Sequence, residues 1–337
     1  MLLIPDGVTV VTMNDMAEVV VVGAGVIGLS IAHELAVEGH RVQILAEKDA
    51  ASSVSSVAAA IWFPHDINAS AQVLDSAQST YLRLQQLAGC PETGVRMRQG
   101  TVLIRDTNTD TSWTRAVPQH EWLTAAQMPD DLFVDSGVSG VRCTVPIVLI
   151  DVYLRWLHAA VLDLGVRVRT AAVRNPYEVL DQENRDALVV AAGIRSAALL
   201  GDDDESHPIR GQIVRLANPG LTEWVTDDYN PEGLTYVVPR EHDVVCGGTG
   251  DRGAWDETVD PEVEQAILRR TRALVPALAR QPVLSRAVGL RPARTSVRLE
   301  AVAGYDKPVF ACYGHGGAGF TVSWGDAARV AKLIGPA

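Results

Sequence analysis

The sequence predicts an α/β protein that opens with a parallel β-α-β unit. Residues 19–22 form an unbroken apolar run, which predicts a buried parallel strand. Gly23, Gly25 and Gly28 follow as G-x-G-x-x-G, and residues 29–37 carry the apolar spacing of a helix. Because strand, glycine turn and helix come in this order, the segment predicts a Rossmann-like dinucleotide site with the pyrophosphate at the helix N-terminus.

Each glycine of this turn has its own role in the prediction. Gly23 permits the tight turn, Gly25 lets backbone amides approach a pyrophosphate, and Gly28 lets helix and strand pack closely. A second strand over 41–46 ends at Glu47, where a carboxylate can accept hydrogen bonds from an adenosine ribose. The motif does not decide between FAD and NAD, and glycine turns also occur without a ligand.

Composition describes an ordinary soluble globular protein. The 337 residues are enough for one large α/β domain or two intertwined ones, with 47% hydrophobic and 21% charged residues. The formal net charge of -12 argues against binding a nucleic-acid backbone or an anionic membrane through bulk electrostatics. We therefore expect neither a nucleic acid nor a membrane as partner.

The four cysteines predict no metal site, since none forms a C-x-x-C pair, and we expect them to be reduced and mostly buried. No apolar run is long enough to span a bilayer, and the N-terminus lacks the pattern of a signal peptide. Residues 1–16 are interpreted as a frayed leader or an upstream start. A cytoplasmic protein is expected.

Helical spacing predicts further helices over 75–88, from Pro146 through Leu164, and over 260–275, with a closing helix after Trp324. The small residues of 57–64 suit either contact with a flat ligand or tight helix packing. Residues 201–206 are acidic and are expected to form a solvated loop.

Short strands and turns are expected over 101–145, and a half-exposed strand over 166–173. The apolar run 187–192 follows a predicted helix and runs into Gly193, which repeats the β-α-β pattern at the start of the chain. This strand should therefore return to the first sheet. An antiparallel meander distinct from the dinucleotide domain is expected at 211–216, 234–239 and 243–248, and the last strands are expected at 296–300 and 308–313.

Motifs spread over 17–334 resemble the D-amino-acid oxidase family, which also includes D-aspartate oxidase. The stretches that carry the resemblance are VVVVGAGVIGLS at 19–30, SVAAAIWFPH at 56–65, GLRPARTSVRLE at 289–300 and YGHGGAGFTVSWG at 313–325. Weaker support comes from RGQIV at 210–214, LTYVVP at 234–239 and GGTGDRGAWD at 247–256.

The resemblance implies a discontinuous, Rossmann-like FAD-binding domain interleaved with an α+β substrate domain built on an antiparallel sheet. The FAD-binding domain would comprise 17–65, 146–205 and 285–337, and the substrate domain 66–145 and 206–284. It also implies non-covalent FAD, a homodimer, and a D-amino acid and molecular oxygen as the reactants.

Arg291 matches the family arginine that grips the substrate carboxylate, with two parallel donors and a permanent charge. Tyr236 matches a tyrosine whose hydroxyl also meets the carboxylate. The family's second active-site tyrosine has no aligned counterpart, and Tyr229 is the candidate to replace it from a rearranged loop. Gly317, with Gly316, would present a carbonyl to the substrate amine.

The resemblance places further residues around FAD. The glycine loop would bring Gly319, Phe320 and Thr321 to the pyrimidine edge of the flavin, where donors stabilise developing negative charge. The family's usual glycine is replaced by Ala60. The remaining cofactor-binding candidates are Gly23, Gly25, Val26, Ile27, Gly28, Glu47, Lys48, Ser53, Ala59, Ile61, Val173, Gly193 and Gly316.

The implied reaction is hydride transfer from Cα to flavin N5 without a general base, followed by reoxidation by oxygen to hydrogen peroxide. His315 is given a structural role. The additional arginines of D-aspartate oxidases correspond here to Tyr229 and Gly250, so neutral, apolar D-amino acids are expected.

Alternative hypotheses remain at this point. A D-aspartate oxidase or a glycine or sarcosine oxidase would share the fingerprint, and an NAD-dependent dehydrogenase would explain residues 18–47 equally well. A non-catalytic flavin-binding protein is a further alternative, because of the missing tyrosine.

Overall fold

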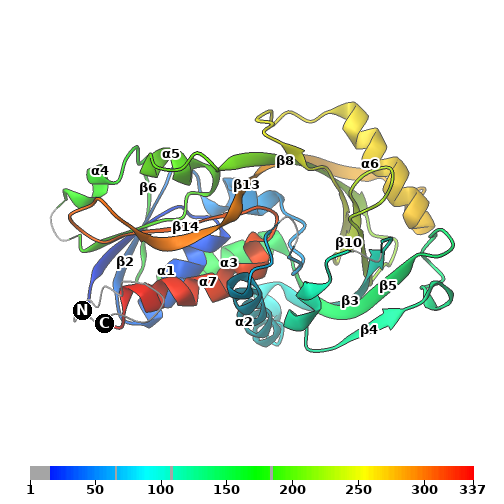
Figure 1. The fold of residues 1–337 in the computed structure, drawn as a ribbon, viewed down its shortest axis with the longest axis horizontal. Coiled ribbons are helices and arrows are strands. Elements are labelled where there is room, and N and C mark those ends of the chain that lie inside the picture. The colour runs from blue at the N-terminus through cyan, green and yellow to red at the C-terminus, as the bar shows by residue number, and fades with distance from the viewer. Residues whose placement is uncertain (1–15, 65–66, 107–108, 183–184) are drawn as a thin grey trace.

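The computed structural model describes residues 16–64, 67–106, 109–182 and 185–337. Within these ranges the strands form one mixed sheet of 14 strands (Figure 1). Their order is β4-β5-β3-β9-β10-β11-β8-β13-β14-β7-β1-β2-β6, with β12 (Asp251–Arg252) paired to β8. His65 and most of the expected leader lie outside the described residues.

The parallel end of the sheet is the predicted β-α-β unit. Strand β1 (Glu18–Val22) pairs in parallel with β2 (Arg41–Ala46) on one side and β7 (Ala187–Val190) on the other. The return of the second apolar run to the first sheet is thus confirmed. Strand β6 (Arg167–Thr170) extends this end beyond β2, and β14 (Val309–His315) pairs in parallel with β7.

Three helices pack on one face of this parallel end: α1 (Val26–Val37), α3 (Ile150–Asp163) and α7 (Gly319–Ile334) (Figure 1). Helix α1 is buried along nearly its whole length, because both the sheet and α7 cover it. Its apolar side chains join those of β1 and β2 in the largest core cluster. Helix α1 is therefore enclosed between the sheet and α7.

The other end of the sheet is the predicted antiparallel meander. Strands β8 (His207–Ala217), β11 (Asp243–Gly247), β10 (Thr235–Pro239) and β9 (Trp224–Asp227) pair antiparallel in that order. The sheet continues through β3 (Val95–Ile104), β5 (Ser139–Val148) and β4 (His120–Leu123). Helix α6 (Pro261–Leu274) packs on it, and Asp260 caps that helix as its sequence predicts.

The two ends are joined by β13 (Val283–Val302), a 20-residue strand that crosses the molecule (Figure 1). Its first half pairs with β8 as far as Ala293, and its second half pairs with β14, with a register irregularity between Ala293 and Arg298. The meander is therefore continuous with the dinucleotide sheet, where a distinct sheet was expected. The strand begins well before the predicted 296–300. Its first part was not predicted, because arginines interrupt the alternation of apolar residues there.

Pro146 does not open a helix. It lies inside β5, and α3 begins at Ile150. Pro146 faces Met97 of β3, but its carbonyl oxygen accepts a hydrogen bond from the Trp62 backbone N–H at 2.9 Å, away from β3. The missing proline N–H therefore points away from β3, beyond Cys143, where the pairing of β5 with β4 stops, so no ladder bond with either strand is lost.

The closing helix also differs from the expectation. Helix α7 begins at Gly319, and Trp324 lies buried inside it, where its indole Nε1 donates to the Tyr153 hydroxyl at 2.8 Å. Helix α2 (Ala71–Leu87) confirms the amphipathic helix expected over 75–88, with Ser70 as its N-cap. Two short helices, α4 (Tyr177–Leu180) and α5 (Ser196–Leu200), complete the set.

The acidic loop at 201–206 is not simply solvated. The Asp203 carboxylate is 1% exposed, accepts a hydrogen bond from the Tyr313 hydroxyl at 2.7 Å, and pairs with Arg294. Asp202 pairs with Arg298. The cysteines are free, and Cys143, Cys246 and Cys312 are buried while Cys90 is exposed. Among the described residues, none of the helices has both the length and the apolar character needed to cross a membrane.

Candidate active site

A cavity of about 800 Å³ runs from the glycine turn of the parallel end to the antiparallel strands. Its volume lies within the range of small-molecule and cofactor sites. One end is lined by the turn between β1 and α1 and by the residues that follow β2, and the other by Tyr236 and Arg291. The cavity therefore joins the predicted cofactor residues to the predicted substrate residues.

The glycine turn is built so closely that side chains would not fit. A Cβ on Gly23, whose φ is +120°, would lie 2.3 Å from the Ala191 carbonyl oxygen, and one on Gly28 would lie 2.0 Å from the Gly23 carbonyl oxygen. Gly28 packs beneath the turn and does not line the cavity, whereas Gly23 and Gly25 do. This is the geometry that a dinucleotide pyrophosphate requires.

The N-terminus of α1 opens into the cavity. Its N-cap is Gly25, which has no side chain to accept hydrogen bonds from the first turn. The Val26 N–H donates to the Ser55 hydroxyl oxygen at 3.0 Å, and Val26, Ile27 and Ser55 all line the cavity. Orphan amide donors and the helix dipole favour an anion here. The run of serines after β2 was the sequence feature that could have pointed to Ser55 as a residue of this site.

Glu47 lies at the end of β2 as predicted and lines the cavity. Its carboxylate forms an ion pair with Arg195, which also lines the cavity and which sequence reasoning missed. Both side chains are about half exposed. Lys48, Val173 and Gly193 line the same end. The predicted ribose and adenine contacts are therefore gathered together, with Arg195 as an additional cation among them.

The middle of the cavity is walled by Ser53 and by Ala59, Ala60 and Ile61. Ala60 has a φ of +53°, a left-handed conformation that normally favours glycine. This explains in physical terms why glycine suits the position that Ala60 occupies. The small side chains of Ala59 and Ala60 occupy little of the cavity at this point.

The N-terminus of α7 faces this wall. Gly316, Gly317, Gly319 and Phe320 line the cavity, and the first intrahelical hydrogen bond of α7 is donated by Val322 to Ala318. The amides before Val322 therefore supply donors and a positive helix end. Thr321 does not line the cavity; its hydroxyl donates to the Phe63 carbonyl oxygen at 2.8 Å.

Arg291 and Tyr236 meet although two strands separate them. Tyr236 is on β10 and Arg291 on β13, with β11 and β8 between. Each intervening strand has a glycine where a side chain would collide: a Cβ on Gly247 would lie 2.1 Å from Tyr236 Cζ, and one on Gly211 would lie 2.6 Å from Arg291 Nη2. The two side chains can therefore lie flat across the sheet.

The electrostatics of this pair suit a carboxylate ligand. Burial raises the pKa of the Tyr236 hydroxyl, while the charge of Arg291 and a hydrogen bond with it act in the opposite direction. The Tyr236 hydroxyl therefore stays protonated and can donate. Arg291 Nη1 donates to the Thr249 carbonyl oxygen at 3.0 Å, which fixes the guanidinium plane. The Gly316 N–H donates to the carbonyl oxygen of Pro292, so the glycine loop is tied to the strand that carries Arg291.

Tyr229 is not brought to the cavity. Its side chain is 58% exposed and does not line the site, because the turn after β9 directs it outward. The preceding residue, Asp228, lines the cavity instead, together with Trp255 and Glu257. Sequence reasoning missed these three residues, although the resemblance at 247–256 included Trp255.

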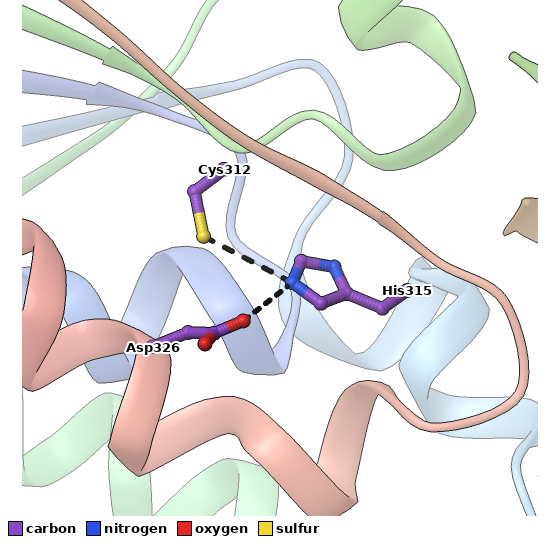
Figure 2. Close-up of side chains that lie close together, drawn as sticks. All are labelled: Cys312, His315 and Asp326. Carbon is purple, nitrogen blue, oxygen red and sulfur yellow. Dashed lines mark hydrogen bonds and ion pairs between the residues drawn. The ribbon is translucent and has the colours of Figure 1, made fainter. Parts of the chain in front are cut away.

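Cys312, His315 and Asp326 form a buried cluster beside the cavity (Figure 2). Their ligand-type atoms lie within 4.8 Å of one another, a spacing that could hold a metal ion. His315 and Asp326 already hydrogen-bond to each other without a metal, since His315 Nε2 lies 3.0 Å from Asp326 Oδ2. Burial also raises the pKa of the Cys312 thiol well above its usual value, which disfavours the thiolate that a metal needs. The two-residue spacing of Cys312 and His315 was the available signal for this cluster.

Comparison with known proteins decides the family. A family model described as FAD dependent oxidoreductase matches residues 18–333. The chain is 38% identical over 325 residues to a D-amino-acid oxidase of Rubrobacter xylanophilus, an alignment that covers 96% of this chain and 97% of the relative. The chain belongs to the FAD-dependent oxidoreductase family. The resemblance inferred from the sequence motifs is thereby confirmed, and the cofactor of this oxidoreductase is FAD.

Other members of the family are similar over comparable lengths. A human D-aspartate oxidase is 30% identical over 336 residues, covering 95% of each chain. The solved structure of a glycine oxidase from Geobacillus kaustophilus has a TM-score of 0.79 at 21% identity, covering 94% of this chain and 95% of that one. The structural likeness shows the shared FAD-dependent oxidoreductase fold.

The residues present fit FAD. The turn at Gly23 and Gly28 leaves no room for side chains, and helix N-termini face the cavity at Val26 and Gly319. Glu47 lies at the end predicted to bind the ribose, and the cavity continues past the small residues at 59–60 to Tyr236 and Arg291. The residues predicted for cofactor and for substrate therefore line one cavity.

Proposed function

We propose that this enzyme oxidatively deaminates D-amino acids, giving the 2-oxo acid, ammonia and hydrogen peroxide. The observation that carries the proposal is the meeting of Arg291 and Tyr236 at the end of the FAD cavity, made possible by glycines on the two strands between them. A fixed guanidinium with two parallel donors, beside a protonated phenol, is a receptor for a small carboxylate.

The residues of the chain act by positioning. Arg291 is oriented by the Thr249 carbonyl, so a substrate carboxylate bound to it has one fixed direction. Tyr236 adds a hydrogen bond to that carboxylate, and Gly317 is proposed to offer its carbonyl oxygen to the substrate amine. With carboxylate and amine both fixed, one face of Cα is directed at the flavin, which selects one enantiomer.

FAD, when bound, would accept the hydride that leaves Cα, and oxygen would then take two electrons and two protons to become hydrogen peroxide. The imino acid that remains would react with water to give the 2-oxo acid and ammonia. This route needs no general base from the chain. The raised pKa of Tyr236 keeps its proton in place. Orientation and electrostatics are therefore what the chain contributes.

We further propose a preference for neutral, apolar side chains over acidic ones. Asp228 and Glu257 line the same cavity as Arg291, and their charge opposes a second substrate carboxylate. A D-aspartate oxidase activity, which the human relative has by name, is therefore disfavoured. Glycine and sarcosine are the other substrates to compare, because the glycine oxidases share the fold.

The experiment is a substrate panel read by hydrogen peroxide formation and oxygen consumption. D-Valine, D-methionine and D-alanine should be oxidised faster than D-aspartate, glycine and sarcosine, with one peroxide formed per oxygen consumed. Faster turnover of D-aspartate would overturn the side-chain preference, and faster turnover of sarcosine would overturn the reaction assigned to the site.

A homodimer, a cytoplasmic location and the lack of nucleic-acid or membrane partners remain our predictions from the sequence. The net charge of -12 supports the last of these. Light scattering of the holoenzyme measures its oligomeric state, and a homodimer should have twice the chain mass of 36.1 kDa.

A further inference from the structure

His315 and Asp326 form a buried pair at the wall of the cofactor cavity (Figure 2). His315 ends β14 at the start of the glycine loop, and Asp326 lies in α7. Each side chain is 3% exposed, and Nε2 of His315 lies 3.0 Å from Oδ2 of Asp326. A buried pair this close is held in one geometry, because loss of either partner would leave a polar group without a hydrogen bond.

The surroundings of Asp326 determine which atom of the pair carries the proton. The Ser76 hydroxyl donates to Asp326 Oδ1 at 2.6 Å, and Arg329 Nη1 lies 3.6 Å from the same oxygen. Asp326 is thus surrounded by donors and acts as an acceptor. The proton between the two residues is therefore assigned to His315 Nε2, so a ring with a single proton is the Nε2–H tautomer.

This tautomer leaves Nδ1 of His315 as a hydrogen-bond acceptor. Within the described part of the chain, the side-chain contacts of His315 all involve Nε2, which also lies 3.9 Å from the Cys312 sulfur. Figure 2 shows Nδ1 on the side of the ring away from Asp326. Since His315 itself lines the cavity, its second nitrogen is the polar atom of the ring that a bound molecule can use.

We propose that Asp326 is a positioning residue for FAD: it holds His315 in the Nε2–H tautomer so that Nδ1 accepts a hydrogen bond from an N–H or O–H group of the bound cofactor. His315 is then a cofactor-binding residue in its own right. The Ser76 hydroxyl supports the arrangement from α2 by donating to Oδ1 of Asp326, so that α2, α7 and the end of β14 meet at one carboxylate.

The test is a double-mutant cycle on FAD affinity of the apoprotein, measured by the quenching of flavin fluorescence on binding. Asp326→Ala should weaken FAD binding about tenfold, and Asp326→Asn should stay within about threefold of wild type, because an amide oxygen can still accept from Nε2–H. His315→Gln keeps a donor for Asp326 but has no counterpart of Nδ1, so it should weaken FAD binding about tenfold as well.

The decisive comparison is Asp326→Ala added to His315→Gln. If Asp326 acts through Nδ1, the second substitution should change the FAD dissociation constant less than twofold, because the acceptor is already lost. A second tenfold loss would show that Asp326 supports only the fold, and would overturn the proposal. Thermal unfolding of each apoprotein separates FAD affinity from stability.

A spectroscopic measurement tests the tautomer directly. Nitrogen NMR of histidine-labelled apoprotein should show His315 with a proton on Nε2 and a bare Nδ1, and Asp326→Ala should mix the two tautomers. A His315 ring protonated on Nδ1 in the wild-type protein would contradict the proposal even if the affinities changed as expected. Neither result depends on which substrate the enzyme oxidises.

Discussion

The side chains of Tyr236 and Arg291 approach one another across two strands that carry glycine at the points where they pass, Gly247 on β11 and Gly211 on β8. Neither glycine can be recognised as functional from its local pattern, since Gly211 lies between Arg210 and Gln212 within β8 and Gly247 is the last residue of β11. Together they leave a sheet face, which side chains would normally fill, open for Arg291 and Tyr236, the two residues of the proposed carboxylate site.

The first prediction concerns the guanidinium of Arg291. Arg291→Lys keeps the charge but loses the parallel donors, so kcat/KM for a D-amino acid should fall about 10- to 100-fold. Arg286→Lys is the matched control: Arg286 is on the same strand, pairs with Glu264 outside the cavity, and its variant should stay within twofold. Equal losses in both variants would remove Arg291 from its proposed role.

The second prediction concerns Gly247. A methyl group there would meet the Tyr236 ring, so Gly247→Ala should displace the phenol and lower kcat/KM at least tenfold, while FAD affinity stays within about threefold. Gly250→Ala is the control, because the nearest atom to its Cβ would be Ile209 Cγ2 at 3.8 Å. An unchanged kcat/KM in Gly247→Ala would argue that Tyr236 does not contact the substrate.

The third prediction concerns the backbone of Ala60. Its left-handed conformation costs an alanine roughly 1–2 kcal/mol. Ala60→Gly relieves this strain but adds chain entropy, so its free energy of unfolding should stay within about 1 kcal/mol of wild type. Ala59→Gly gains no such relief and should be less stable than Ala60→Gly by about 1 kcal/mol, measured by denaturant unfolding. The reverse order would contradict the backbone assignment.

The fourth prediction is a loss of stability in alkaline solution. Burial raises the pKa of the Cys143 and Cys246 thiols from 9.0 to about 12. Because these folded-state values lie above the unfolded value, the stabilising contribution is fully present below pH 9 and is lost as pH rises from 9 towards 12. The free energy of unfolding should therefore be flat below about pH 8.5 and fall by several kcal/mol by pH 12.

A double variant isolates the thiols in that experiment. Cys143→Ala with Cys246→Ala should be less stable at neutral pH but show a shallower fall above pH 9. Tyr153, whose pKa is also raised by burial, accounts for part of the slope that remains. An identical slope in wild type and variant would mean that other groups cause the alkaline transition.

The parallel end of the fold was predictable because its signals are local. An apolar run, three glycines and a carboxylate at the end of the next strand lie within one β-α-β unit, and the structure places Glu47 where this pattern predicts. Asp260 and Pro261 likewise marked the start of α6. These features depend on residues close in sequence, so they can be predicted from the sequence alone.

The rest depends on contacts between distant residues. Pro146 is tolerated in β5 because β4 ends before it, which no local pattern reveals. Asp203 is buried because Arg294 and Tyr313 lie beside it, and Arg195 joins the cofactor end because it faces Glu47. Tyr229 was proposed to replace a tyrosine that has no aligned counterpart, and the turn after β9 directs it to the surface.

The most direct test of the central claim is anaerobic mixing of the FAD-loaded enzyme with the two enantiomers of one apolar amino acid, such as D- and L-methionine. If Arg291 and Tyr236 fix the carboxylate in one direction as proposed, D-methionine should bleach the flavin absorbance and L-methionine should leave it unchanged. Bleaching by the L-enantiomer at a comparable rate, or by neither, would contradict the site as described.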